Sequence, residues 1–194
     1  MYKFLIIFFI SLPFCSCKKN PTPSIQDSFP GYYEAKKITS TVAVDMNNDG
    51  LKSTDLYSEI SGPVTTPDGQ YISFYNFESI RNYIEVRPLH NQSVMAKYID
   101  FNFPHQVIDS LSDNTAFLMT YKNELLGYTY EFNENNSVRV TSSNPAYTNE
   151  IGKINNLTLK EGGNLTIGLK KRVFDFVDKT WQEIDIVVEY FKAP

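Results

Sequence analysis

The chain has 194 residues, 42% of them hydrophobic and 21% charged, which is typical of a globular protein and excludes a disordered one. Its formal charge of −4, without long basic runs, excludes nucleic acid as the main partner because phosphate binding needs clustered lysine and arginine. The length suits one domain with a sizeable core. Aromatic residues reach 14%, mostly Tyr and Phe, which favours strands.

The N-terminus has the pattern of an export signal. Lys3 precedes an apolar run over residues 4–14, which is too short to span a bilayer as an ordinary helix. The run leads to Cys17, and the small Ser16 before it resembles the lipobox of bacterial lipoproteins. In that family the cysteine is acylated, by palmitate for example, and becomes the first mature residue. The resemblance implies that residues 1–16 are a signal peptide and that lipid on Cys17 binds the membrane.

An ordinary signal peptide followed by a free cysteine is the alternative. Cys15 fits the acylated position less well than Cys17, because the bulky Phe14 would stand at the cleavage site. Cleavage after residue 16 leaves Cys17 as the sole cysteine, and an exported protein has little use for one lone thiol beside its cleavage site. We therefore expect a lipid-anchored protein of the bacterial cell envelope, at the outer membrane. Whether it faces the periplasm or the cell surface stays open.

Residues 17–30 contain the lipidated cysteine and a polar, proline-containing stretch without periodicity. This composition is typical of a flexible tether that reaches at most about 40 Å. From residue 31 to 194, short alternating segments separated by turn residues predict one all-β domain. We expect about eight to ten antiparallel strands in a meander, forming a barrel or a β-sandwich. Residues 53–60 form the one plausible helix, with Leu56 and Ile60 one turn apart.

The last predicted strand shows the alternation most clearly. Ile184, Ile186 and Val188 share one face, whereas Glu183 and Asp185 point to the other. Such a strand has one side in the core and one side in solvent, which fits either a barrel or a sandwich.

The order of elements resembles the lipocalin-like small lipoproteins of Gram-negative bacteria. The resemblance rests on the opening Gly31-Tyr32-Tyr33, the Asp-rich loop with a short helix, the β-meander, and the closing Tyr190-Phe191-Lys192. It implies a barrel with an apolar cup and a non-enzymatic role in binding a small apolar ligand. The alternative is a β-sandwich that binds a glycan or a partner protein on an exposed aromatic face.

The sharpest local motif is an Asp-x-Asn-x-Asp-Gly loop that resembles EF-hand and dockerin calcium loops. Its candidate calcium ligands are Asp45, Asn47, Asp49, the carbonyl of Leu51, Ser53 and Asp55. The closing acid is displaced, since Asp55 comes one residue early and Glu59 three residues late. The alternative is a turn in which the Asp and Asn side chains bond to the backbone. Calcium here would have a structural role.

No arrangement of nucleophile, base and orienting group is evident, so we expect no enzymatic activity. The histidines, His90 and His105, follow or flank prolines in predicted loops, which is unlike a zinc site. Residues 170–172 place three basic side chains on one strand, so at least one should point inward or along an edge. Trp181 is expected either to cap the barrel end beside the 178–179 turn or to offer an exposed ring to a ligand.

Overall fold

The computed structural model describes residues 26–65, 71–73, 75–88, 97–110, 117–133, 137–142 and 144–194. The predicted signal peptide over residues 1–16, the predicted lipidation site Cys17, and His90 lie outside these residues. Within the described part of the chain, no helix is long and apolar enough to cross a membrane.

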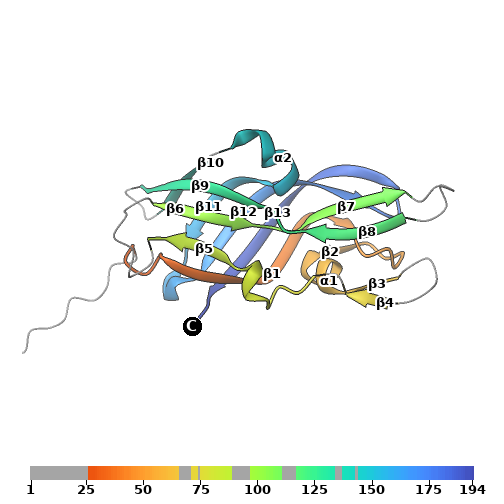
Figure 1. The fold of residues 1–194 in the computed structure, drawn as a ribbon, viewed down its shortest axis with the longest axis horizontal. Coiled ribbons are helices and arrows are strands. Elements are labelled where there is room, and N and C mark those ends of the chain that lie inside the picture. The colour runs from red at the N-terminus through yellow and green to blue at the C-terminus, as the bar shows by residue number, and fades with distance from the viewer. Residues whose placement is uncertain are drawn as a thin grey trace, which may run out of the picture.

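The chain is built mainly of strands (Figure 1). The strands are β1 (Gly31–Val44), β2 (Ser53–Asp55), β3 (Pro63–Thr65), β4 (Tyr71–Ser73), β5 (Ile84–Arg87), β6 (Tyr98–Asn102), β7 (His105–Ser110), β8 (Phe117–Lys122), β9 (Leu125–Phe132), β10 (Ser137–Ser142), β11 (Lys153–Leu159), β12 (Leu165–Asp175) and β13 (Thr180–Lys192). The helical segments are α1 (Leu56–Ser61), α2 (Thr148–Ile151) and the 3₁₀ turns η1 (Ile80–Asn82), η2 (Pro145–Tyr147) and η3 (Glu161–Gly163).

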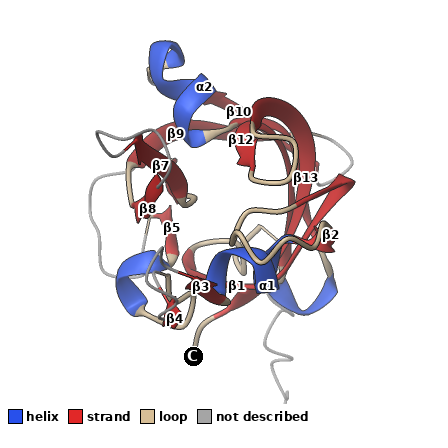
Figure 2. Cartoon of the chain, turned by 90° about the vertical axis from the view of Figure 1, so that its right-hand side faces the viewer, coloured by secondary structure: helices blue, strands red, loops and turns tan. Residues whose placement is uncertain are grey.

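Eight antiparallel strands form a closed barrel. They follow one another in the order β1, β5, β6, β9, β10, β11, β12 and β13, and β13 then pairs with β1. The closing pair runs from Tyr33 opposite Lys192 to Ser40 opposite Ile186. Figure 2 shows these strands arranged around a ring. The predicted all-β class and the barrel are therefore confirmed, and the alternative β-sandwich is wrong. Closure removes the exposed sheet edges that a sandwich keeps.

The alternation predicted for the last strand is also confirmed. Ile184, Ile186 and Val188 are at most 2% exposed, while Glu183 and Asp185 face solvent. β12 and β13 pair continuously from Leu165 opposite Tyr190 to Asp175 opposite Thr180, which makes this hairpin the longest uninterrupted ladder of the barrel.

The predicted helix is shorter at its start than the sequence pattern indicated. Residues 53–55 form β2, which pairs with β1 through Ser53 opposite Val44 and Asp55 opposite Thr39. α1 then begins at Leu56, and Leu56 and Ile60 are fully buried on its inner face. Strand pairing thus extends to the residue before the helix, a long-range contact that the helical periodicity of residues 53–60 could not reveal.

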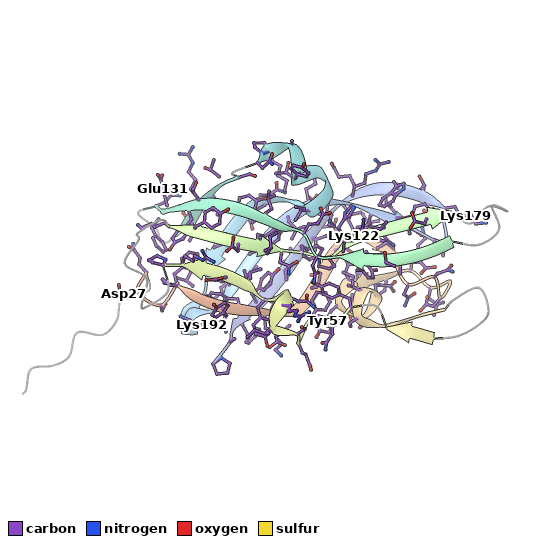
Figure 3. All side chains as sticks on the ribbon, in the orientation of Figure 1. Asp27, Tyr57, Lys122, Glu131, Lys179 and Lys192 are labelled. Carbon is purple, nitrogen blue, oxygen red and sulfur yellow. The ribbon has the colours of Figure 1, made fainter. Side chains whose placement is uncertain are left out.

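The barrel has two ends, and aromatic side chains close one of them. At one end, which we call the Phe29 end, the ring of Phe29 is fully buried and packs edge-on against Tyr130 at 4.8 Å and Phe132 at 5.3 Å. The Tyr33 hydroxyl donates a hydrogen bond to the Phe29 carbonyl at 2.6 Å. Asp27 lies at this end and Lys179 at the opposite end, which we call the loop end because the Asp-rich loop lies there (Figure 3).

Candidate functional site

The Asp-rich loop joins β1 to β2 and folds around its own backbone. Asp45 Oδ1 accepts a hydrogen bond from the Asn48 amide at 2.7 Å, and Asp45 Oδ2 accepts one from the Gly50 amide at 3.0 Å. Asn48 and Gly50 both have positive φ, 61° and 82°, a conformation that asparagine and glycine adopt most readily. Burial is the main reason that the pKa of Asp45 lies above its ordinary value, although these amides act against the rise.

The next two polar side chains repeat this pattern along the loop. Asn47 Oδ1 accepts a hydrogen bond from the Asp49 amide at 3.0 Å, and Asp49 Oδ1 accepts one from the Leu51 amide at 2.7 Å. The Asn47 carboxamide also donates to Asp49 Oδ2 at 3.2 Å. These contacts are those of successive Asx turns, the alternative to calcium binding.

Of the remaining candidate calcium ligands, Ser53 and Asp55 serve other contacts. Leu51 is 71% exposed. The Ser53 hydroxyl accepts a hydrogen bond from the Asp55 amide at 3.0 Å, and Asp55 accepts one from the Ser58 hydroxyl at 2.7 Å. The structure therefore brings Asp45, Asn47 and Asp49 together and uses Ser53 and Asp55 at the start of α1. Within the described residues, no group of three or more His, Cys, Asp or Glu side chains could hold a metal ion. The contacts favour the turn, and calcium binding is left to experiment.

Glu59 of α1 is the acid that reaches this loop. It is 4% exposed, and its Oε2 accepts a hydrogen bond from the Met46 amide at 2.7 Å. Burial raises the pKa of Glu59 to about 7, the Met46 amide opposes that rise, and the charges of Asp49 and Asp45 add to it. Glu59 therefore exchanges its proton near neutral pH. In the sequence, Glu59 stands out only as a displaced calcium ligand. Its place one residue before Ile60 and three after Leu56 marks it as inward-facing.

Three hydrogen bonds join the Asp-rich loop, β7 and the end of β12. The Phe176 amide donates to the Asp45 carbonyl at 2.9 Å. Gln106 of β7, which is 1% exposed, accepts a hydrogen bond from the Phe174 amide at 2.8 Å and donates to the Met46 carbonyl at 3.4 Å. Each buried polar group here satisfies a backbone group that the barrel ladder leaves unpaired.

The hydroxyl of Tyr121 is an exception in this region. It is buried and has no hydrogen-bond partner. Burial raises its pKa, and the nearby charges of Glu59 and Asp45 raise it further. Asp45, Glu59 and this phenol thus lie close together at the loop end.

The other residues singled out by the sequence have structural contacts. Lys171 is 2% exposed, and its Nζ lies 5.7 Å from the centre of the Phe103 ring, so the prediction that one of the three basic residues points inward is confirmed. Trp181 is half-buried and packs edge-on against Phe174 at 5.5 Å, beside the β12–β13 turn, as the end-capping alternative predicted. Arg172 lies over the Trp181 ring at 5.4 Å.

A groove of about 480 Å³ lies on the outside of the barrel, between β9 and the η2–α2 segment. Its rim contains Tyr98, Glu124, Leu125, Asn144 and Tyr147. Leu125 is 66% exposed and Tyr147 is 51% exposed, so two apolar surfaces stand open to solvent. The volume falls within the range of about 300–1,000 Å³ that small-molecule sites occupy.

The groove is held in shape by the core beneath it. The Tyr128 hydroxyl donates to the Gly152 carbonyl at 3.2 Å and so fixes the end of α2 against β9. Ile151 is 2% exposed and anchors α2 over the same strand. Gly152 has a φ of 113°, which lets the chain turn from α2 into β11.

No family model matches this chain. Neither a curated protein nor a solved structure matches it. The resemblance to lipocalin-like lipoproteins therefore stays a prediction, although the closed eight-stranded barrel is the architecture that it implies.

The groove was not predicted from the sequence. Tyr98 and Leu125 begin adjacent strands, while Asn144 and Tyr147 follow β10, so the groove depends on strand pairing that brings distant segments together. One signal was available in the sequence. Leu125 alternates with the inward-facing Leu126 and so lies on the outer face of its strand, where a leucine marks an apolar surface without a cover.

Proposed function

We propose that this protein is a lipid-anchored protein of the bacterial cell envelope whose barrel binds a ligand or partner without catalysing a reaction. The anchor rests on the sequence of residues 1–17, in which Ser16 precedes Cys17. The position of Asp27 supports this anchor, because the chain enters the barrel at the Phe29 end (Figure 3). A tether that starts there points the loop end away from the membrane.

The packed interior is the observation that favours binding on the outer surface. Phe29, Tyr33, Phe101 and Phe103 point inward and are at most 1% exposed. The Phe101 ring also packs edge-on against Tyr128 at 6.0 Å. A small apolar ligand inside this part of the barrel would have to displace such side chains, each of which contributes about 3–5 kcal/mol to stability. We therefore infer that the ligand binds outside, and we keep an enclosed apolar ligand as the competing proposal.

Metabolic labelling with a palmitate analogue tests the anchor. The full-length chain should incorporate the label and partition into the detergent phase, because several acyl chains hold a protein firmly at a bilayer. Cys17→Ala should abolish both, whereas the matched change Cys15→Ala should leave both intact. Label retained in the Cys17→Ala variant would contradict lipidation at this position.

Native mass spectrometry of the extracted protein distinguishes the two binding modes. Binding on the outer surface predicts the mass of the lipidated chain alone, since a weakly held surface ligand is lost during extraction. A copurified lipid-sized ligand that survives extraction would instead support the enclosed apolar ligand and contradict the proposal. Phe101→Ala, which opens space in the core, should then increase the occupancy of such a ligand.

A further inference from the structure

We propose that the groove between β9 and the η2–α2 segment binds a neutral sugar ring. This inference rests on the proposed function, in which the barrel binds through its outer surface. The rim of the groove offers both apolar and polar surfaces within one small volume of about 480 Å³. A pyranose presents the same combination, with an apolar C–H face and hydroxyl groups around its edge.

The apolar part of the groove suits stacking. Tyr147 is 51% exposed, and Tyr98 of β6 lines the same groove. A phenol ring offers a large rigid face at a low cost in conformational entropy. Leu125 adds an aliphatic surface that is 66% exposed. Together these side chains can cover the C–H face of a sugar.

The polar part of the groove is free to bind hydroxyl groups. Within the described residues, the Glu124 carboxylate and the Asn144 carboxamide take part in no hydrogen bond or ion pair. A carboxylate accepts hydrogen bonds, and a carboxamide both accepts and donates them, which matches adjacent hydroxyls of a sugar. Polar groups that converge on a pocket and lack protein partners are those that determine ligand orientation.

The charge of the groove narrows the ligand class. Among the described residues that line the groove, Glu124 is the one charged residue, and none of them is Lys, Arg or His. A phosphate or carboxylate ligand would therefore meet a negative charge without a compensating cation. A purely apolar ligand would bury the Glu124 carboxylate without a hydrogen bond, which is costly. A neutral ligand that carries hydroxyl groups avoids both costs.

The groove is also preformed, since the Tyr128–Gly152 hydrogen bond and the buried Ile151 fix α2 against β9. A preformed site loses less conformational entropy on binding than a loop that must first become ordered.

Saturation-transfer NMR with four neutral disaccharides, namely chitobiose, cellobiose, maltose and lactose, tests the proposal. The full-length protein is used in a detergent that has no sugar headgroup. At least one disaccharide should bind. Tyr147→Ala should weaken that binding about tenfold or more through loss of the stacking face, and Glu124→Gln should weaken it several-fold. Tyr32→Ala, which removes a 42% exposed tyrosine on β1 outside the groove, should leave binding unchanged.

Three outcomes overturn the sugar assignment. One is the absence of saturation transfer to all four disaccharides in a sample whose melting curve shows that the protein is folded. A second is binding that Tyr147→Ala and Tyr32→Ala affect equally. If Nα-acetyl-lysine methyl ester binds in place of the sugars and Tyr147→Ala abolishes its binding, the groove is a cation site and the sugar proposal is wrong. Binding on the outer surface would still stand, because only an enclosed ligand seen by native mass spectrometry contradicts it.

Discussion

Lys52 Nζ lies 2.9 Å from Oδ2 of Asp175, and Asp175 is fully buried. The Asp175 carboxylate also accepts hydrogen bonds from the Val177 amide at 3.0 Å and the Gln182 carboxamide at 2.8 Å. Lys52 reaches Asp178 as well, at 2.7 Å. One lysine thus joins the Asp-rich loop to the β12–β13 hairpin.

Replacing Lys52 with Met should destabilise the protein, because the buried Asp175 carboxylate loses its cation. The free energy of unfolding at neutral pH should fall, and by more than in the control variant with an exposed ion pair. Chemical denaturation measures this loss. Lys170→Met is the control, since Lys170 forms an exposed pair with Glu183 at 3.4 Å, and it should cost about 0.5 kcal/mol or less. Equal losses in both variants would contradict a special role for Lys52.

The loss of stability caused by Lys52→Met should depend on pH. Burial tends to raise the pKa of Asp175, but Lys52 and the backbone amides outweigh it, so the pKa lies below its ordinary value of 3.8. The stabilisation is therefore present above 3.8 and is lost as the pH falls through the folded-state value. Unfolding curves recorded at decreasing pH should show the variant and the wild type converging in acid. A deficit that stays constant would contradict this assignment.

Glu59→Gln should flatten the dependence of stability on pH. In the folded protein the pKa of Glu59 is raised from 4.5 to about 7, so the folded state binds this proton more tightly. Wild-type stability should then fall as the pH rises from 4.5 to 7, by about 1–3 kcal/mol. Glutamine keeps a hydrogen-bond acceptor for the Met46 amide and does not ionise. As the pH rises, the melting temperature of the Glu59→Gln variant should therefore increase relative to that of the wild type. Glu131→Gln, at an exposed position, should follow the wild type.

Calcium should leave the melting temperature unchanged. The oxygens of Asp45, Asn47 and Asp49 already accept backbone amides, which favours the turn over the ion site. Melting curves in millimolar calcium and in a chelator should coincide. A calcium-dependent rise of several degrees, lost in Asp49→Asn, would contradict the turn and place an ion in the loop, because a ligand of the folded state stabilises it.

Phe29→Ala should be among the most destabilising single changes at the Phe29 end. Its ring is fully buried against Tyr130 and Phe132, and its removal leaves a cavity. The expected loss is about 3–5 kcal/mol by chemical denaturation. Phe191→Ala removes a ring that is 44% exposed, and its cost should be about 1 kcal/mol or less. Similar losses in both variants would show that Phe29 does not close the barrel end.

Local patterns predicted much of the fold because they report which face of a strand is buried. The inward Ile184, Ile186 and Val188 follow directly from alternation with period two. The choice between barrel and sandwich could not be made in this way, since both bury one face of every strand. That choice depends on whether β13 pairs with β1, a contact between segments about 150 residues apart.

The sites were predicted less well than the fold, for a related reason. The Asp-rich loop is contiguous, so its turn could be read from one stretch of sequence. Glu59 approaches it only because Leu56 and Ile60 turn α1 inward. Tyr98 and Tyr147 come together only through the pairing of β6 with β9 and the position of α2.

The closing strand pair also determines how the molecule bears mechanical load. β1 and β13 are antiparallel, with Tyr33 opposite Lys192, and the Ala193 amide donates to the Tyr32 carbonyl at 2.8 Å beside them. A force that separates Gly31 from Lys192 loads these hydrogen bonds one after another, in the unzipping direction. A force between the Phe29 end and the loop end runs along the strands and loads the whole ladder in shear. If Cys17 anchors the protein as proposed, a pull on the loop end therefore loads the barrel in its stronger direction.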